Sequence, residues 1–250
     1  MDDFDLSITY NKVLQFILDY EKMPFSFFNN FEERITYEEY GLGGTFLPRG
    51  YYCPSLILDI ISGNVSRGKI QKKKPKERVS DFTFCFDCEN KLILVKRIDS
   101  FEYVIHQNQF EIGICFSNDM KIETISYCQF DDQKILSYVW CLYNPYEKKI
   151  VELIEEKYKY LEKEVCVDWF RLIPIKNRKV QQHNQYVFSI ENGYFSSYTV
   201  QEFDENQLRK KFLENRVFKV MAKRKLDSNL IFKKRSEQNS SMEQIEHKCK

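Results

Sequence analysis

The sequence predicts an α+β protein in which an antiparallel β-meander is accompanied by an N-terminal, a mid-chain and a C-terminal helix. Two observations predict the sheet. Between Phe82 and Phe116, apolar residues alternate with polar ones in successive short runs, as the two-residue period of a strand requires. The breaks between these runs are short and rich in Asn, Asp, Ser and Gln, which favour turns. Short turns join antiparallel neighbours, so a meander follows.

The helices are predicted from apolar residues at steps of three and four. Such a pattern runs from Leu6 to Tyr20, and it returns over residues 147–165, where Glu155 and Lys159 are spaced as a helical ion pair. Asp204 and Gln207 have the spacing of a capping box, which predicts a last helix over 204–225.

With 250 residues, the chain can form a core that needs neither a metal nor disulfides. We expect one domain over residues 1–225. The expected order is a helical and loop part over 1–66, a basic loop over 67–80, the sheet with the mid-chain helix over 81–203, the C-terminal helix over 204–225 and a disordered tail over 226–250.

Two features of the sequence bear on compartment. No apolar run approaches the ~20 residues that span a bilayer, and the first residues are acidic where a secretory signal is basic. The eight cysteines mostly lie in apolar strand patterns, where a free thiol behaves as a small hydrophobic group. We therefore predict a cytoplasmic protein without a disulfide framework.

Candidate catalytic chemistry is sparse. Cys85 and Cys88 form a CxxC, but a zinc site needs two further ligands at close spacing, and a redox site needs a helix that lowers a thiol pKa. His106, His183 and His247 stand singly, with no hydrolase motif around them. We expect no catalytic residue, no metal and no cofactor, and a role of Cys85 and Cys88 beyond packing stays open.

The net charge of +1 hides a segregation of charge along the chain. Residues 1–60 and 81–206 are acidic overall, whereas 67–78 and 207–250 are basic. This pattern is more typical of an interaction protein than of a nucleic-acid face, which gathers its positive charge on one surface. The basic run RGKIQKKKPKER could contact phosphate, form a solvated loop or contact an acidic protein, and it lacks the interleaved aromatic residues of many single-strand binders.

Acidic residues on the expected sheet and helix are the candidate partner-binding groups. Neighbouring carboxylates point apart on a strand or a helix, so they do not converge on a substrate. We hypothesise instead that they face a basic partner. The candidates are Asp131, Asp132, Glu152, Glu155 and Glu156.

The segment YEEYGLGGTFLPRGYYCPS, the aromatic meander and the acidic segment EKKIVELIEEKYKYLEKEV follow one another along the chain. In style and order of elements, residues 6–205 resemble the cytoplasmic immunity proteins that Gram-positive bacteria encode beside secreted or contact-delivered toxins. The resemblance implies a single-domain α+β protein that binds one toxin, blocks its active site and catalyses nothing. It transfers no functional residue.

The sequence is compatible with two other functions. One is a nucleic-acid-binding protein that uses the basic loop 67–78 and the C-terminal helix. The other is an enzyme whose site is assembled from residues that no local motif reveals. The partner, the binding face and the oligomeric state are not determined by the sequence.

Overall fold

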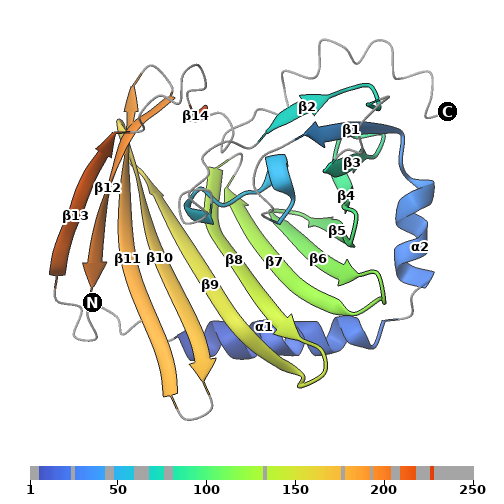
Figure 1. Ribbon diagram of the computed structural model, residues 1–250, viewed down its shortest axis with the longest axis horizontal. Helices are drawn as coiled ribbons and strands as arrows, with labels where there is room; N and C mark the ends of the chain where they lie inside the picture. Colours follow the sequence, from blue (N-terminus) through green and yellow to red (C-terminus); the bar gives the residue numbers. More distant parts are fainter. Residues whose placement is uncertain are drawn as a thin grey trace.

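The protein is dominated by one long antiparallel sheet, as a computed structural model shows (Figure 1). The structure describes residues 6–23, 26–42, 48–58, 68–75, 81–131, 134–175, 178–191, 194–203, 209–217 and 226–227. Within these residues the helices are α1 (Leu6–Glu21), α2 (Ser26–Glu33) and the short 3-10 helix η1 (Gly50–Tyr52). The strands are β1 (Tyr37–Leu42), β2 (Lys69–Gln71), β3 (Phe82–Phe86), β4 (Leu92–Lys96), β5 (Ser100–Gln107), β6 (Phe110–Ser117), β7 (Ile122–Asp131), β8 (Lys134–Asn144), β9 (Lys149–Tyr160), β10 (Glu164–Ile175), β11 (Arg178–Glu191), β12 (Tyr194–Phe203), β13 (Arg209–Val217) and β14 (Leu226–Asp227).

The sheet confirms the predicted antiparallel meander. From β3 to β13 each strand pairs with the next along the chain, so spatial order follows sequence order. Beyond β3 the order is β1 and then β2, which places β2 at one end of the sheet, while β14 pairs with β12. Asn90 and Asn108 take positive φ in two of the connections, a conformation that asparagine tolerates better than most residues.

The predicted α+β class is wrong, because the described part is mostly antiparallel sheet with its α-helices at the N-terminus. The N-terminal helix is confirmed as α1. The mid-chain helix over 147–165 is wrong: these residues form β9 and the start of β10. The C-terminal helix over 204–225 is also wrong, since β13 occupies its centre.

A spacing of four residues explains the error in β9. Four residues are about one helical turn, but they are also two strand periods, so Ile154 and Tyr158 share a face in either structure. Pairing decides between the two, because β9 bonds to β8 on one edge and to β10 on the other. The β-branched and aromatic residues of this segment suit a strand that is paired on both edges.

Two further predicted boundaries change. Part of the basic loop over 67–80 is the edge strand β2, and residues 76–80 lie outside the described part. The predicted tail over 226–250 also lies outside it, apart from β14. None of the helices in the described ranges is long and apolar enough to cross a membrane.

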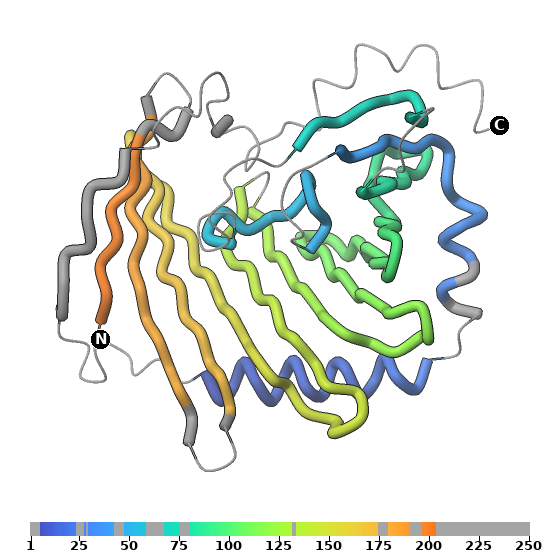
Figure 2. The backbone as a smooth tube through the Cα atoms, viewed as in Figure 1, coloured from blue at the N-terminus to red at the C-terminus, as the bar shows by residue number. Residues whose placement is uncertain are grey.

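The two faces of the sheet carry separate cores. On one face, called here the helix side, α1 contacts β7 and β9 and α2 contacts β4, as Figure 2 lets the reader follow. On the other face, called here the strap side, residues 49–58 lie across the sheet; we call them the strap. The strap-side core joins Cys53, Leu56, Ile57 and Leu58 of the strap to buried residues of β7 to β12.

Candidate functional site

Arg49 fastens the strap to three neighbouring strands. Its Nε donates to Glu102 Oε1 at 2.9 Å, its Nη1 to Glu111 Oε2 at 3.0 Å and its Nη2 to Ser126 Oγ at 3.0 Å. The Arg49 side chain is only 1% exposed. Because β5, β6 and β7 each supply one acceptor, a single guanidinium ties the strap to the sheet across three strands.

The backbone of β6 makes room for this cluster at Gly113. A Cβ there would lie 2.0 Å from Glu102 Oε1, 2.5 Å from Ser126 Oγ and 2.8 Å from Arg49 Nη2. The guanidinium therefore needs a glycine beneath it. Burial by itself would lower the pKa of Arg49, but the nearby carboxylates outweigh it and raise that pKa above its ordinary value.

Glu156 is a second attachment of the strap. Ser55 Oγ donates to Glu156 Oε1 at 2.5 Å, and the Tyr158 hydroxyl donates to Glu156 Oε2. The backbone N–H of Leu56 in turn donates to the Tyr158 oxygen at 3.3 Å. Desolvation, followed by the charge of Glu156, raises the pKa of Tyr158 well above its ordinary value. Glu156 thus anchors the strap in the interior.

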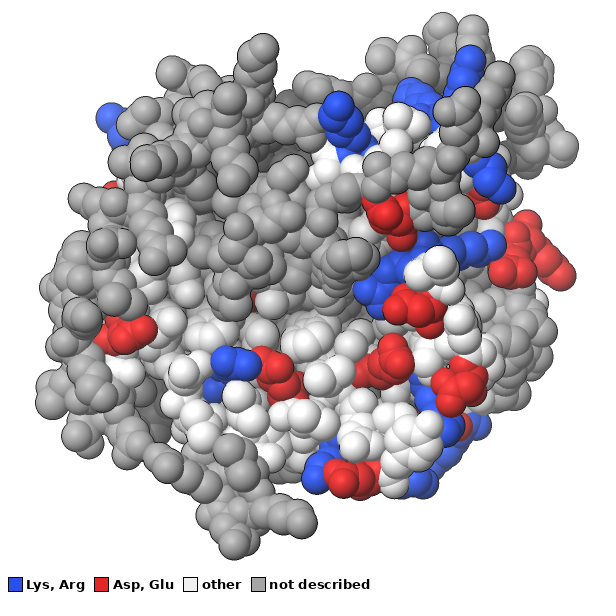
Figure 3. Space-filling view, viewed as in Figure 1, with Lys and Arg blue, Asp and Glu red and all other residues white. Residues whose placement is uncertain are grey.

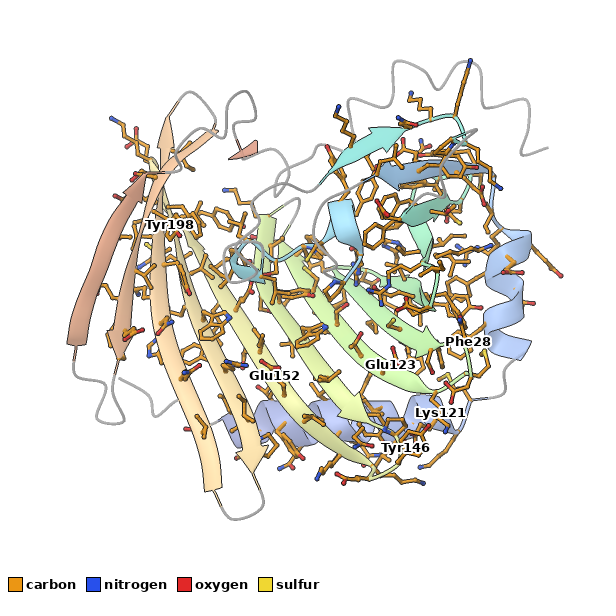
Figure 4. The ribbon with its side chains drawn as sticks, in the orientation of Figure 1. Phe28, Lys121, Glu123, Tyr146, Glu152 and Tyr198 are labelled. Atoms are coloured by element: carbon orange, nitrogen blue, oxygen red, sulfur yellow. The ribbon has the colours of Figure 1, made fainter. Side chains whose placement is uncertain are left out.

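The structure does not bring the predicted acidic residues together. Glu155 and Glu156 are neighbours on β9 and point to opposite faces, and both are buried. Thr9 Oγ1 of α1 donates to Glu155 Oε2 at 3.0 Å. Glu152, visible midway along β9 in Figure 4, accepts from Arg171 Nε at 2.6 Å.

Of the other two candidates, Asp131 is the last residue of β7. Asp131 is exposed there, and Asp132 lies outside the described residues. A role of these acidic residues in binding a partner stays a prediction. The contacts that the structure shows for Glu155 and Glu156 are within the protein, with Thr9 and Ser55.

The two CxxC thiols lie in different surroundings. Cys85 is buried, and desolvation, opposed by Lys96 and aided by Glu38, raises its pKa to about 12, whereas Cys88 is exposed in the turn after β3. His106 bonds through Nε2 to the Leu92 carbonyl oxygen at 2.7 Å. In the residues that the structure describes, no group of three or more His, Cys, Asp and Glu side chains is placed to hold a metal ion.

An aromatic stack lies on the helix side of β10, β11 and β12. The His183 ring packs between the rings of Phe170 and Phe203, with centroid distances of 4.2 and 4.4 Å. His183 Nε2 lies 3.3 Å from Asp168 Oδ1, and Gln185 Nε2 donates to the same oxygen at 3.1 Å. Gln201 lies opposite Gln185 on β12. We call this surface the distal face, and its members are Asp168, Phe170, His183, Gln185, Gln201 and Phe203.

Sequence reasoning missed the distal face because its members come from three strands. Phe170, His183 and Phe203 are opposite one another only through the register of β10 with β11 and of β11 with β12. The hydrogen bond from His183, more than that from Gln185, holds the pKa of Asp168 below its ordinary value despite burial.

Lysines gather at the opposite end of the sheet. Lys69 on β2 and Lys72, Lys73 and Lys74 just after it are all exposed, and we call them the lysine edge. Figure 3 shows basic side chains over β2 at the upper border of the view. Ile70 lies between them in sequence and packs inward against the cluster of Phe82, Phe84, Phe86 and Val95.

No protein-family model, no curated protein and no solved structure matches this chain.

Proposed function

We propose that this chain is a non-catalytic protein-binding module, and specifically an immunity protein that neutralises a bacterial toxin by direct binding. The resemblance of the sequence over residues 6–205 to that class supports the proposal, except at residues 147–165, which form strands where a helix was expected. The observation that carries it is the distal face, a rigid surface of aromatic and amide side chains.

The distal face has the composition of a protein interface. Phe203, Gln185 and Gln201 are partly exposed, and the Asp168 side chain is 38% exposed. Interface centres are rich in aromatic residues and poor in charged ones, with polar groups around them. Phe170 is buried in the helix-side core, whereas Gln185, Gln201 and Phe203 lie on β11 and β12, the strands that follow β10 in the sheet.

The aromatic side chains of this face are held in place before any partner arrives. The stack orders His183 between two phenylalanine rings, and the hydrogen bond to Asp168 fixes the ring further. Association costs less when the contacting side chains lose little rotamer freedom. A strand platform of this kind therefore suits recognition of a preformed surface on another protein.

Three buried thiols of the described part are poorly suited to covalent catalysis. Burial raises the pKa of Cys115 and Cys141 to about 12 and that of Cys128 well above its ordinary value. A thiol must be a thiolate to act as a nucleophile, so these groups are unreactive at neutral pH. Cys128 and Cys53 serve the strap-side core.

The test is titration calorimetry with a catalytically inactive form of the toxin encoded beside this chain. We expect tight binding by the wild type and binding at least tenfold weaker, about 1.4 kcal/mol, for Gln201→Arg, which adds a large charged group at the centre of the distal face. The matched control is Gln107→Arg, an exposed glutamine at the end of β5.

Two results would contradict the proposal. One is a folded wild-type protein that does not bind the adjacent toxin. The other is a Gln201→Arg variant that binds as tightly as the Gln107→Arg control, because the distal face would then lie outside the interface.

The lysine edge favours nucleic-acid binding as a second candidate function. Its four exposed lysines would make phosphate contacts that weaken steeply with salt. The predicted C-terminal helix, the other half of that surface, is replaced at its centre by β13. Titration of a labelled oligonucleotide at two salt concentrations tests this candidate, and salt-insensitive or absent binding removes it.

A further inference from the structure

The outer edge of β2 is unpaired among the residues that the structure describes. β2 is the last strand of the sheet order and pairs with β1 on its inner side, through Tyr40 with Gln71, Gly41 with Ile70 and Leu42 with Lys69. No strand of the described part pairs with its outer side. A strand in this position presents unpaired N–H and C=O groups, which can template another strand.

Packing of Ile70 on the inner face holds β2 in place. Ile70 packs against the cluster of buried phenylalanines on β3, and Tyr51 and Tyr52 pack against the same cluster. The Tyr52 ring lies edge-on to Phe84, with ring centroids 4.9 Å apart. Along Lys69–Gln71, an incoming segment would therefore meet a backbone that is already in strand conformation, which lowers the cost of pairing.

The positive charge of the lysine edge is not neutralised by its neighbours. Among the described residues, none of its four lysines forms an ion pair. The carboxylates of the adjoining strand β1 have other partners, since the Tyr40 hydroxyl donates to Glu38 at 2.7 Å and the Tyr52 hydroxyl donates to Glu39. Among the described residues, the charge of these four lysines is therefore not compensated and can attract a binding partner.

This charge also decides which segments can pair there. Lysines on an edge strand repel a second copy of the same edge and discourage aggregation. The same lysines attract a strand that carries carboxylates, because opposite charges on neighbouring strands stabilise pairing. The lysine edge therefore repels basic strands and attracts acidic ones.

We propose that the outer edge of β2 binds an extended acidic segment of a partner protein, which adds to the sheet as a further strand beside Lys69–Lys74. The inference goes beyond the proposed function, because it concerns another surface and can be tested without a toxin. Main-chain hydrogen bonds would supply part of the affinity, and the lysines would supply selectivity for carboxylates.

A protein segment fits this edge better than a nucleic acid does. The three residues of β2 expose a backbone that another backbone can pair with, whereas a phosphate chain carries no matching donors and acceptors. The residues between the lysines are Ile70 and Gln71, so the edge offers no aromatic side chain on which bases could stack.

The experiment measures fluorescence anisotropy of a labelled peptide of alternating Glu and Val with the full-length protein. Six residues of it span about 20 Å, enough to reach along Lys69–Lys74. The same peptide with alternate backbone nitrogens methylated keeps its charge but cannot pair as a strand. An oligothymidylate of equal charge serves as the nucleic-acid probe.

We expect saturable binding of the acidic peptide and at least tenfold weaker binding of the methylated peptide. The variant Lys72→Glu, Lys73→Glu, Lys74→Glu should also lose at least tenfold. The matched control reverses three exposed lysines elsewhere, Lys148→Glu, Lys159→Glu and Lys163→Glu, and should bind within about twofold of the wild type.

Four outcomes would overturn the inference. They are absence of saturable peptide binding, equal affinity for the methylated peptide, equal loss in the control variant, and tighter binding of the oligonucleotide in competition with the peptide. Each can occur while toxin binding at the distal face is intact, so failure here is distinct from failure of the proposed function.

Discussion

Replacement of Arg49 by methionine tests whether the guanidinium holds the strap on the sheet. Methionine fills similar volume but leaves Glu102 and Glu111 without their cationic partner, and these side chains are only 7% and 15% exposed. Removal of one partner from a buried ion pair costs about 3–5 kcal/mol, because an uncompensated charge remains in the interior. His106 Nδ1, 3.3 Å from Glu111 Oε1, offers Glu111 partial relief.

The expected loss of 3–5 kcal/mol corresponds to a fall in Tm of about 6–20 °C for a protein of this size. Urea unfolding followed by circular dichroism measures the loss in the free energy of unfolding. The triple variant Arg49→Met, Glu102→Gln, Glu111→Gln should recover most of the loss, since neutral amides tolerate burial better than charges. The control is Lys96→Met, which removes the 41% exposed partner of Glu32, itself 63% exposed, and should cost about 1 kcal/mol or less.

A free energy of unfolding of Arg49→Met within about 1 kcal/mol of the wild-type value would show that the guanidinium does not hold the strap. This role of the guanidinium is also refuted if the triple variant is as unstable as the single one, because the cost would then come from lost packing and not from stranded carboxylates.

Three further predictions concern the stability of the fold and the exposure of its thiols. Gly113→Ala should lower the free energy of unfolding by about 1–3 kcal/mol or more, since its Cβ has no room; unchanged stability would contradict the geometry. In a Cys249→Ser background, Ellman's reagent should modify Cys88 first, and Cys88→Ser should abolish that fast phase. Asp168→Asn should destabilise at neutral pH, because the His183 hydrogen bond lowers the folded-state pKa; the difference should shrink as pH falls below 3.8, and a constant difference would refute it.

Local patterns were sufficient to predict the strands from β3 to β6 and how these neighbours pair. The alternation of Phe82, Phe84 and Phe86 and the short polar turns after them are properties of a few consecutive residues, and β3 to β6 form as they predict. The Asn192-Gly193 pair lies outside the described residues, yet β11 and β12 on either side of it pair as a hairpin.

Local patterns failed where two structures share one spacing. In β9, the four-residue interval between Ile154 and Tyr158 suits a helix and a strand equally, so the neighbours β8 and β10 decide. The same ambiguity hid the burial of Glu155 and Glu156, because a strand sends adjacent side chains to opposite faces and here both faces are covered.

By itself, the sequence determined the alternation of the strands from β3 to β6, the places where the chain turns between them and the antiparallel pairing of these neighbours, since all three depend on contacts within a few residues. Only the tertiary structure decided which distant groups meet. Arg49 lies 53 residues before Glu102 and 77 before Ser126, and the distal face depends on the register of three strands. These contacts follow from which face each strand buries and from what covers it, and no local spacing encodes that.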